Sequence, residues 1–182
     1  AATRTPYPPD LSGVQLTQLM ILRNTYVDLT QADSNNHVRA LRLELDATST
    51  VTGDNVNIDV RNATIRGSIA GTSAVWLHNN QSGAGLVTAH SGSSMTCSGC
   101  ALRVLLSGSD VWLQGSMSAL TTEIKGPQTL NHTGSLTVSG DQLSMVGGAA
   151  TIAGTVECTG AACSSLVSVN ETLQLRGSLS CT

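Results

Sequence analysis

The chain has 182 residues, of which 40% are hydrophobic but only 2% aromatic, with two Trp, two Tyr and no Phe. Only 12% of the residues are charged and the net charge is −3, which argues against electrostatic capture of nucleic acid. No apolar run approaches the roughly 18 residues of a transmembrane helix. Ser and Thr total 44 residues, yet the hydrophobic content predicts a folded chain rather than a disordered one.

The N-terminal residues 1–36 differ from the rest of the chain. They begin with Ala1–Ala2, as a mature terminus does after signal removal, and continue with a Pro-rich stretch at residues 5–9. Residues 14–30 have apolar positions near helical spacing, but β-branched residues and the lack of a cap leave that segment ambiguous. We therefore expect an extended arm or cap over residues 1–36, followed by a body over residues 37–182.

Alternation with a period of two runs along most of the body, as expected for strands. Apolar residues alternate with polar ones over residues 41–45, 56–60 and 173–175. The runs are short and end in Gly, Ser, Asn or Asp, for example at residues 52–55, 107–110 and 139–142. The pattern predicts an all-β protein.

An irregular repeat suggests how these strands are arranged. Residues 107–117, 139–149 and 169–179 share a turn, an apolar-x-apolar strand and a Gly with small neighbours, which aligns Val111, Leu143 and Leu173. Stacked coils with a narrow aliphatic interior would explain the scarcity of large aromatic side chains. We predict a parallel β-solenoid (β-helix) of about seven irregular coils, each of about 20 residues. A β-sandwich or jelly roll is the alternative.

Five cysteines suggest an oxidising location. Cys97 and Cys100 bracket one Gly-containing turn, and Cys158 and Cys163 bracket another, so each pair is predicted to form a local disulfide. Buried free thiols are one alternative, and a zinc site or redox pair is another, since four thiolates in two pairs can bind zinc. Cys181 is left as a free thiol or a handle for an intermolecular bond.

Sequons for N-glycosylation begin at Asn62, Asn80, Asn131 and Asn170, which fits a secreted glycoprotein. Asn-x-Ser/Thr segments are also good turns in their own right.

The sequence predicts no catalytic residues, no metal site and no cofactor. The four histidines lack the spacing of metal ligands and are expected on the surface or in turns. Residues 53–61 resemble strands of pectin-degrading β-helix enzymes over fewer than ten residues, without the clustered acids, His-Gly or Arg-x-Lys elements of those hydrolases. Asp59 and Arg61 are expected to form an exposed ion pair. We therefore expect a protein that is not an enzyme.

The remaining expectation is a structural role. Low charge, β repeats and a Pro-rich leading arm favour a secreted subunit that assembles with copies of itself, or docks into a filament, appendage or viral fibre. A carbohydrate-binding or adhesion module is the main alternative, with Trp76, Trp112 and Tyr26 as the candidate sugar contacts. A polysaccharide-degrading enzyme and an ice-binding solenoid are lesser alternatives, the latter because Thr-x-Thr pairs do not recur once per coil.

Overall fold

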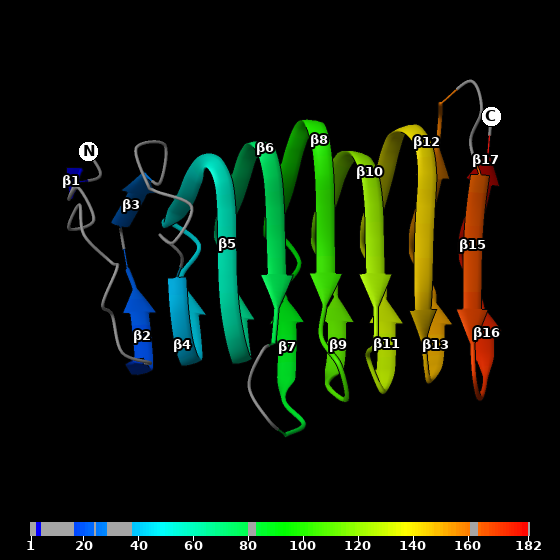
Figure 1. The fold of residues 1–182 in the computed structure, drawn as a ribbon, viewed down its shortest axis with the longest axis horizontal. Helices are drawn as coiled ribbons and strands as arrows, with labels where there is room; N and C mark the ends of the chain where they lie inside the picture. Colours follow the sequence, from blue (N-terminus) through cyan, green and yellow to red (C-terminus); the bar gives the residue numbers. More distant parts are fainter. Residues whose placement is uncertain are drawn as a thin grey trace.

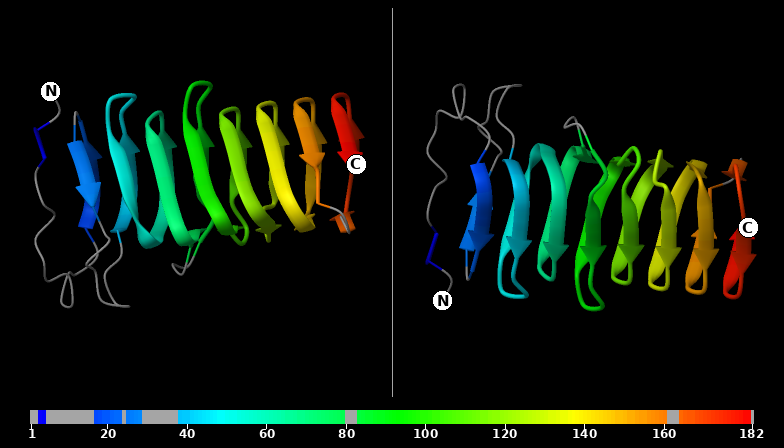
Figure 2. Two further views of the ribbon diagram at one scale, coloured as in Figure 1. Left: turned by 90° about the horizontal axis from the view of Figure 1, so that it is seen from above. Right: turned by 90° about the horizontal axis from the view of Figure 1, so that it is seen from below.

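The computed structural model describes residues 3–4, 17–23, 25–28, 38–79, 83–160 and 164–181. Across these residues the chain is all-β and winds into a β-solenoid of about seven turns, which confirms the predicted architecture. Figure 1 shows the coils stacked side by side along the longest axis, in chain order from β1 to β17. Every strand pairing is parallel, and the views from above and below in Figure 2 show the same row of coils.

The strands fall into three parallel faces, because most coils turn at three corners. The elements are β1 (Thr3–Arg4), β2 (Thr17–Leu22), β3 (Thr25–Asp28), β4 (Val38–Leu45), β5 (Thr50–Ile65), β6 (Ser68–His78), β7 (Leu86–Ala89), β8 (Ser94–Leu105), β9 (Asp110–Leu113), β10 (Ser116–Lys125), β11 (Thr129–His132), β12 (Ser135–Gly147), β13 (Ala149–Ile152), β14 (Thr155–Cys158), β15 (Ser164–Val169), β16 (Leu173–Leu175) and β17 (Ser178–Cys181). Longer strands such as β8 and β10 bend around a corner and contribute to two faces, as the arched ribbons in Figure 1 show.

We name the three faces after their exposed residues. The hydroxyl face consists of residues 50–53, 68–71, 94–97, 116–119, 135–138, 155–158 and 178–181. The Trp76 face consists of residues 55–59, 74–78, 101–105, 121–125, 142–147 and 164–169. The Trp112 face consists of residues 19–22, 42–45, 62–65, 86–89, 110–113, 129–132, 149–152 and 173–175.

Coil length is irregular, as expected, but the expected alignment of the repeat is partly wrong. On the hydroxyl face, equivalent positions are Thr50, Ser68, Ser94, Ser116, Ser135, Thr155 and Ser178, so coils span 18 to 26 residues. Val111 and Leu173 do share one column of the Trp112 face. Leu143 lies instead on the Trp76 face, beside Thr122 and Ser165. Its segment resembled the others only because all the strands have the same apolar-x-apolar pattern.

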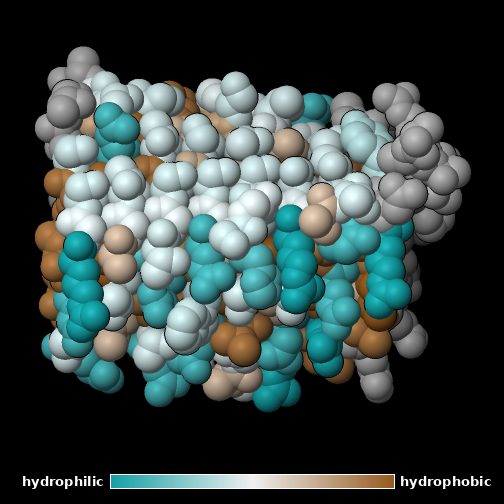
Figure 3. Space-filling model, turned by 180° about the vertical axis from the view of Figure 1, so that it is seen from behind, coloured by the Kyte–Doolittle hydropathy of each residue, from teal (hydrophilic) through white to brown (hydrophobic). Residues whose placement is uncertain are grey.

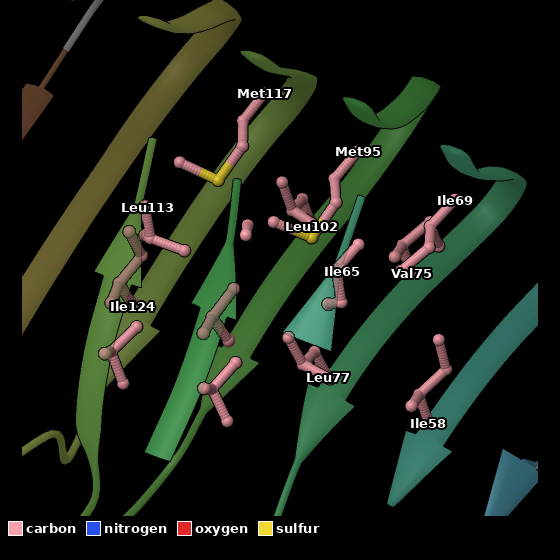
Figure 4. Packing of buried hydrophobic residues seen from close by; sticks show 14 of the residues in the cluster. Ile58, Ile65, Ile69, Val75, Leu77, Met95, Leu102, Leu113, Met117 and Ile124 are labelled. Carbon is pink, nitrogen blue, oxygen red and sulfur yellow. The ribbon is translucent and has the colours of Figure 1, made fainter. Parts of the chain in front are cut away.

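The core is a narrow aliphatic column inside the coils. Inward positions stack on equivalent positions of the next coil, as Ile69, Met95 and Met117 do on the hydroxyl face. Figure 4 shows these side chains, with Val75, Leu77 and Leu102, filling the space between the faces. Each aliphatic side chain removed from water contributes roughly 1.5–3 kcal/mol, so a long stack of them stabilises the body without aromatic residues.

One corner leaves no room for a side chain at its glycine positions, whereas Ser49 and Ser93 occupy the same corner in two other coils. The corner between the Trp112 face and the hydroxyl face carries Gly115, Gly134 and Gly154 in consecutive coils. A Cβ atom on Gly134 would lie 1.9 Å from the carbonyl oxygen of Gly115, and one on Gly154 would lie 2.0 Å from that of Gly134. The Gly-Ser and Gly-Thr pairs of the sequence therefore mark a corner where backbone stacks on backbone.

The ambiguous segment near the N-terminus contains strands. β2 pairs with β4 and β3 pairs with β5, both in parallel, so these strands continue the stacking of the body. Most of residues 1–37 lie outside the described part of the chain, and the boundary at residue 36 stays a prediction.

Candidate functional site

The last described coil exposes side chains that belong to the interior columns. Leu173, Leu175 and Leu179 stack on the buried residues Ala150, Ile152 and Val156 respectively, yet their exposed fractions are 45%, 53% and 38%. Figure 3 shows brown, hydrophobic atoms at the left edge of the molecule, which is the end formed by this coil. Strands β15, β16 and β17 pair with β12, β13 and β14 respectively on one side, and no described strand pairs with their outer edges. We call β15, β16 and β17 the end coil.

The hydroxyl face carries two outward columns made almost wholly of serine and threonine. The first column is Thr50, Ser68, Ser94, Ser116, Ser135, Thr155 and Ser178, and the second is Thr52, Ala70, Thr96, Ser118, Thr137, Glu157 and Ser180. Only Ala70 and Glu157 lack a short hydroxyl side chain. The pale atoms that cross the molecule in Figure 3 have the intermediate hydropathy of these residues.

Sequence reasoning missed these columns because it counted Thr-x-Thr pairs alone. Several coils use serine where others use threonine, as in Ser116-x-Ser118 and Ser135-x-Thr137. A search for either hydroxyl residue at positions i and i+2 directly after a glycine finds three of the seven coils, at residues 115–118, 134–137 and 177–180. The columns place hydroxyl groups about 4.8 Å apart along the solenoid and about 6.6 Å apart along each strand.

A shallow groove lies on the Trp112 face. It encloses about 290 Å³ and is lined by Trp112, Thr129, Leu130, Asn131, Ala149, Ala150, Thr151, Thr172 and Gln174. The outward column Trp112, Asn131, Thr151 and Gln174 runs along it, one residue from each of four successive coils. Because Ala149 and Ala150 have small side chains, the groove remains open between the larger lining residues.

The three candidate sugar contacts have different surroundings. Trp112 is 41% exposed and borders the groove. Trp76 is also exposed, but the guanidinium carbon of Arg103 lies 5.4 Å from its ring centroid, within the range of a cation–π interaction. Tyr26 is half-buried and its hydroxyl lies 3.2 Å from Thr52 Oγ1. The structure does not bring these three aromatic residues together, since they belong to three different faces or strands.

The cysteines give one complete disulfide within the described residues. Cys97 and Cys100 are bonded to each other across a corner of β8, as predicted. Cys158 is also disulfide-bonded, and it occupies the same column as Cys97. The side chains of Cys163 and Cys181 lie outside the described part of the structure, so the predicted pairing of Cys158 with Cys163 stays a prediction. The backbone of Cys181 lies beside that of Cys158.

The sequon asparagines also differ in their surroundings. Asn170 is exposed in the turn after β15. Asn62 and Asn131 are half-buried on the Trp112 face, and Asn62 Oδ1 accepts a hydrogen bond from the backbone N–H of Leu86 at 2.9 Å. Asn80 lies outside the described residues. Whether any of them carries a glycan stays a prediction.

Two expectations for charged and titratable groups were wrong. His132 is fully buried rather than on the surface, because it lies two residues after the inward-facing Leu130 in β11. Its burial lowers the pKa of the imidazole below the ordinary 6.5, although hydrogen bonding with the backbone of Thr155 and Leu113 opposes part of that shift. His78 lies at the edge of the Trp76 face, where its Nε2 forms a hydrogen bond with Asn57 Oδ1. His37 lies outside the described residues.

Asp59 is buried and its partner is not Arg61. Arg39 Nε lies 3.2 Å from Asp59 Oδ2, one coil away on the neighbouring strand. Arg61 instead donates from Nε to the backbone carbonyl of Ala84 at 3.1 Å. The expected exposed pair between Asp59 and Arg61 is therefore wrong. Asp59 lies within β5 opposite Arg39 of the preceding coil, and its carboxylate faces that coil.

Comparisons with known proteins add no function to this geometry. The chain matches no protein-family model, no curated protein and no solved structure. Within residues 3–4, 17–23, 25–28, 38–79, 83–160 and 164–181, no cluster of three or more His, Cys, Asp or Glu side chains is placed to hold a metal ion. The same residues include no helix long and apolar enough to cross a membrane.

Proposed function

We propose that the chain is an extracellular structural subunit that joins a second copy of itself through the end coil. The observation that carries this proposal is the exposure of Leu173, Leu175 and Leu179 on the outer side of the end coil, although each stacks on a buried residue of the aliphatic column. An extracellular location is supported by the Cys97–Cys100 disulfide and the bonded Cys158.

A second copy is the occupant that fits this surface best. Every described strand pairs in parallel on the same three faces, so a coil from another copy would continue all three sheets with the same register. It would pair the outer backbone edges of β15, β16 and β17 and cover the three leucines at once. Such a head-to-tail contact does not close on itself, and repetition would give a filament.

The oligomeric state of the 182-residue chain tests this assembly. We expect analytical ultracentrifugation to show mass that grows with concentration, and negative-stain electron microscopy to show rods longer than one subunit. The double variant Leu175→Glu and Leu179→Glu should be monomeric over the same range, because two buried carboxylates at the contact lack partners.

A matched control keeps the result specific. Leu86 and Leu120 are equally exposed leucines on the sides of the coils, so the double variant Leu86→Glu and Leu120→Glu should assemble like the wild type. Circular dichroism and melting temperature show whether both double variants keep their fold. A wild-type chain that stays monomeric at high concentration, or an end-coil variant that assembles normally, would refute the proposal.

The two hydroxyl columns favour a second candidate function, the binding of an ordered water layer such as the surface of ice. Twelve of the fourteen outward positions on this face carry a Ser or Thr hydroxyl at regular spacing. Regularly spaced hydroxyl groups hold bridging waters in fixed positions. Among these fourteen positions Glu157 is the one charged residue. In the preceding coil the columns continue at Tyr26 and Asp28 of β3, so the rows of hydroxyl side chains begin at Thr50 and Thr52.

Inhibition of ice recrystallisation tests this second function. We expect the wild-type protein to slow crystal growth, and the variant Ser118→Arg and Thr137→Arg to lose most of that effect because two long charged side chains interrupt the columns. Exposed Gln174→Arg on the Trp112 face is the control and should remain active. Equal activity of all three proteins, or none in the wild type, counts against ice binding.

A further inference from the structure

We propose that the groove beside Trp112 is a binding site for a neutral oligosaccharide that lies along the solenoid axis. This site does not depend on assembly, because its central residues come from β9, β11 and β13 on the side of the body. Thr172 and Gln174 of the last described coil line only one end of the groove.

Trp112 supplies the apolar platform for one sugar ring. Its neighbours Val111 and Leu113 face the interior, so the indole is turned outward and remains 41% exposed. An exposed tryptophan stacks well on the C–H face of a pyranose ring, since the ring presents a large apolar surface with little conformational entropy to lose. Unlike Trp76, Trp112 has no cation over its ring among the described residues.

Asn131 supplies a polar group that lacks a partner. Its Oδ1 is buried in the wall of the groove and accepts no hydrogen bond from any described residue. Buried carbonyl oxygens are almost always hydrogen-bonded in native proteins, and each exception needs an explanation. If the Asn131 carboxamide turns toward the groove, this oxygen comes within reach of a sugar hydroxyl one coil along from Trp112.

The charge and shape of the groove define the class of ligand. None of its nine lining residues is charged, so the groove offers nothing to a uronic acid, a phosphate or a sulfate. The nearby Asp110 carboxylate would oppose an anion, and it already accepts a hydrogen bond from Thr129 Oγ1. The groove's volume of about 290 Å³ and its run of polar residues over the three coils beyond Trp112 suit a short, uncharged glycan chain.

Intrinsic fluorescence gives a direct test, because the chain has only two tryptophans. In a Trp76→Phe background, Trp112 is the sole reporter. The protein is produced in a host without N-glycosylation, so that Asn131 is unmodified. We expect cellohexaose or mannohexaose to shift the Trp112 emission with a dissociation constant of about 1 mM or tighter. A hexamer of galacturonic acid should cause no shift.

Calorimetric titration of the same neutral hexasaccharides compares the variants. Trp112→Ala should weaken binding at least about tenfold, whereas Trp76→Ala on the other face should bind like the wild type. Asn131→Leu removes the partnerless oxygen at similar volume, so it should weaken binding while leaving the melting temperature unchanged or higher.

The proposal is wrong if neither neutral hexasaccharide binds at concentrations of about 5 mM. It is also wrong if the galacturonic acid hexamer binds equally well, or if Trp76→Ala removes binding while Trp112→Ala does not. Binding by the monomeric end-coil variant would separate this site from assembly.

Discussion

Replacing Gly134 by valine should cost at least about 3 kcal/mol of the free energy of unfolding. The Cβ of any residue at this corner would lie 1.9 Å from the carbonyl oxygen of Gly115 and 2.7 Å from the carbonyl carbon of Gln114. Both atoms are backbone, so no side chain is free to move aside. Relief requires the two coils to separate, which breaks the bonds from Gly134 N–H to Leu113 O and from Ser135 N–H to Gly115 O.

Urea unfolding followed by circular dichroism measures this effect. Gly134→Ala should already lower stability, because even one methyl group meets the same oxygen. Ser135→Val is the matched control: it places the same valine side chain at the next residue, where the side chain is exposed, and should change stability by less than about 0.5 kcal/mol. If Gly134→Val and Ser135→Val unfold at the same urea concentration, the coils are not in backbone contact at this corner.

The second large effect is a loss of stability in acid that depends on His132. In the unfolded chain this imidazole takes up a proton as the pH falls through about 6.5. In the folded chain its pKa is lower because the side chain is buried, so the folded state gains that proton only at lower pH. Between these two pKa values the unfolded state binds more protons, and the free energy of unfolding falls as the pH falls.

The expected slope is up to about 1.4 kcal/mol per pH unit for this one group. Urea unfolding at several pH values from 7.5 to 5 should show the slope in the wild type and a smaller slope in His132→Leu. The variant leaves the Thr155 carbonyl without its imidazole partner, which lowers stability at every pH but does not create a slope. His90→Gln is the control and should keep the wild-type slope. An unchanged slope in His132→Leu would show that other groups cause the acid sensitivity.

Much of the surface could have been read from the period-two pattern within single strands. Val111 and Leu113 face the interior, and the same alternation turns Trp112 outward. Leu130 faces inward, so His132 had to follow it into the core, although the residue type alone suggested the surface. Treating serine and threonine as equivalent would have revealed the hydroxyl pairs within single strands, such as Ser116 with Ser118 and Ser135 with Thr137, in the same way.

Groupings across coils were not predictable, because coil length varies from 18 to 26 residues. Asp59 forms its ion pair with Arg39, which is 20 residues earlier in the chain, rather than with Arg61 two residues later. The groove joins Trp112 to Ala149 and Gln174 from coils further along, and no spacing in the sequence identifies these neighbours.

The sequence by itself determined the all-β character and the solenoid, since alternation, corner residues and an aliphatic interior without phenylalanine are local or compositional properties. It also predicted the Cys97–Cys100 disulfide, whose partners are three residues apart. Only the tertiary structure decided the column to which each residue belongs, the leucines left open on the end coil, and the burial of Asp59 against Arg39. The physical reason is that register between coils depends on the length of every corner, and each insertion shifts the neighbours of the residues that follow it.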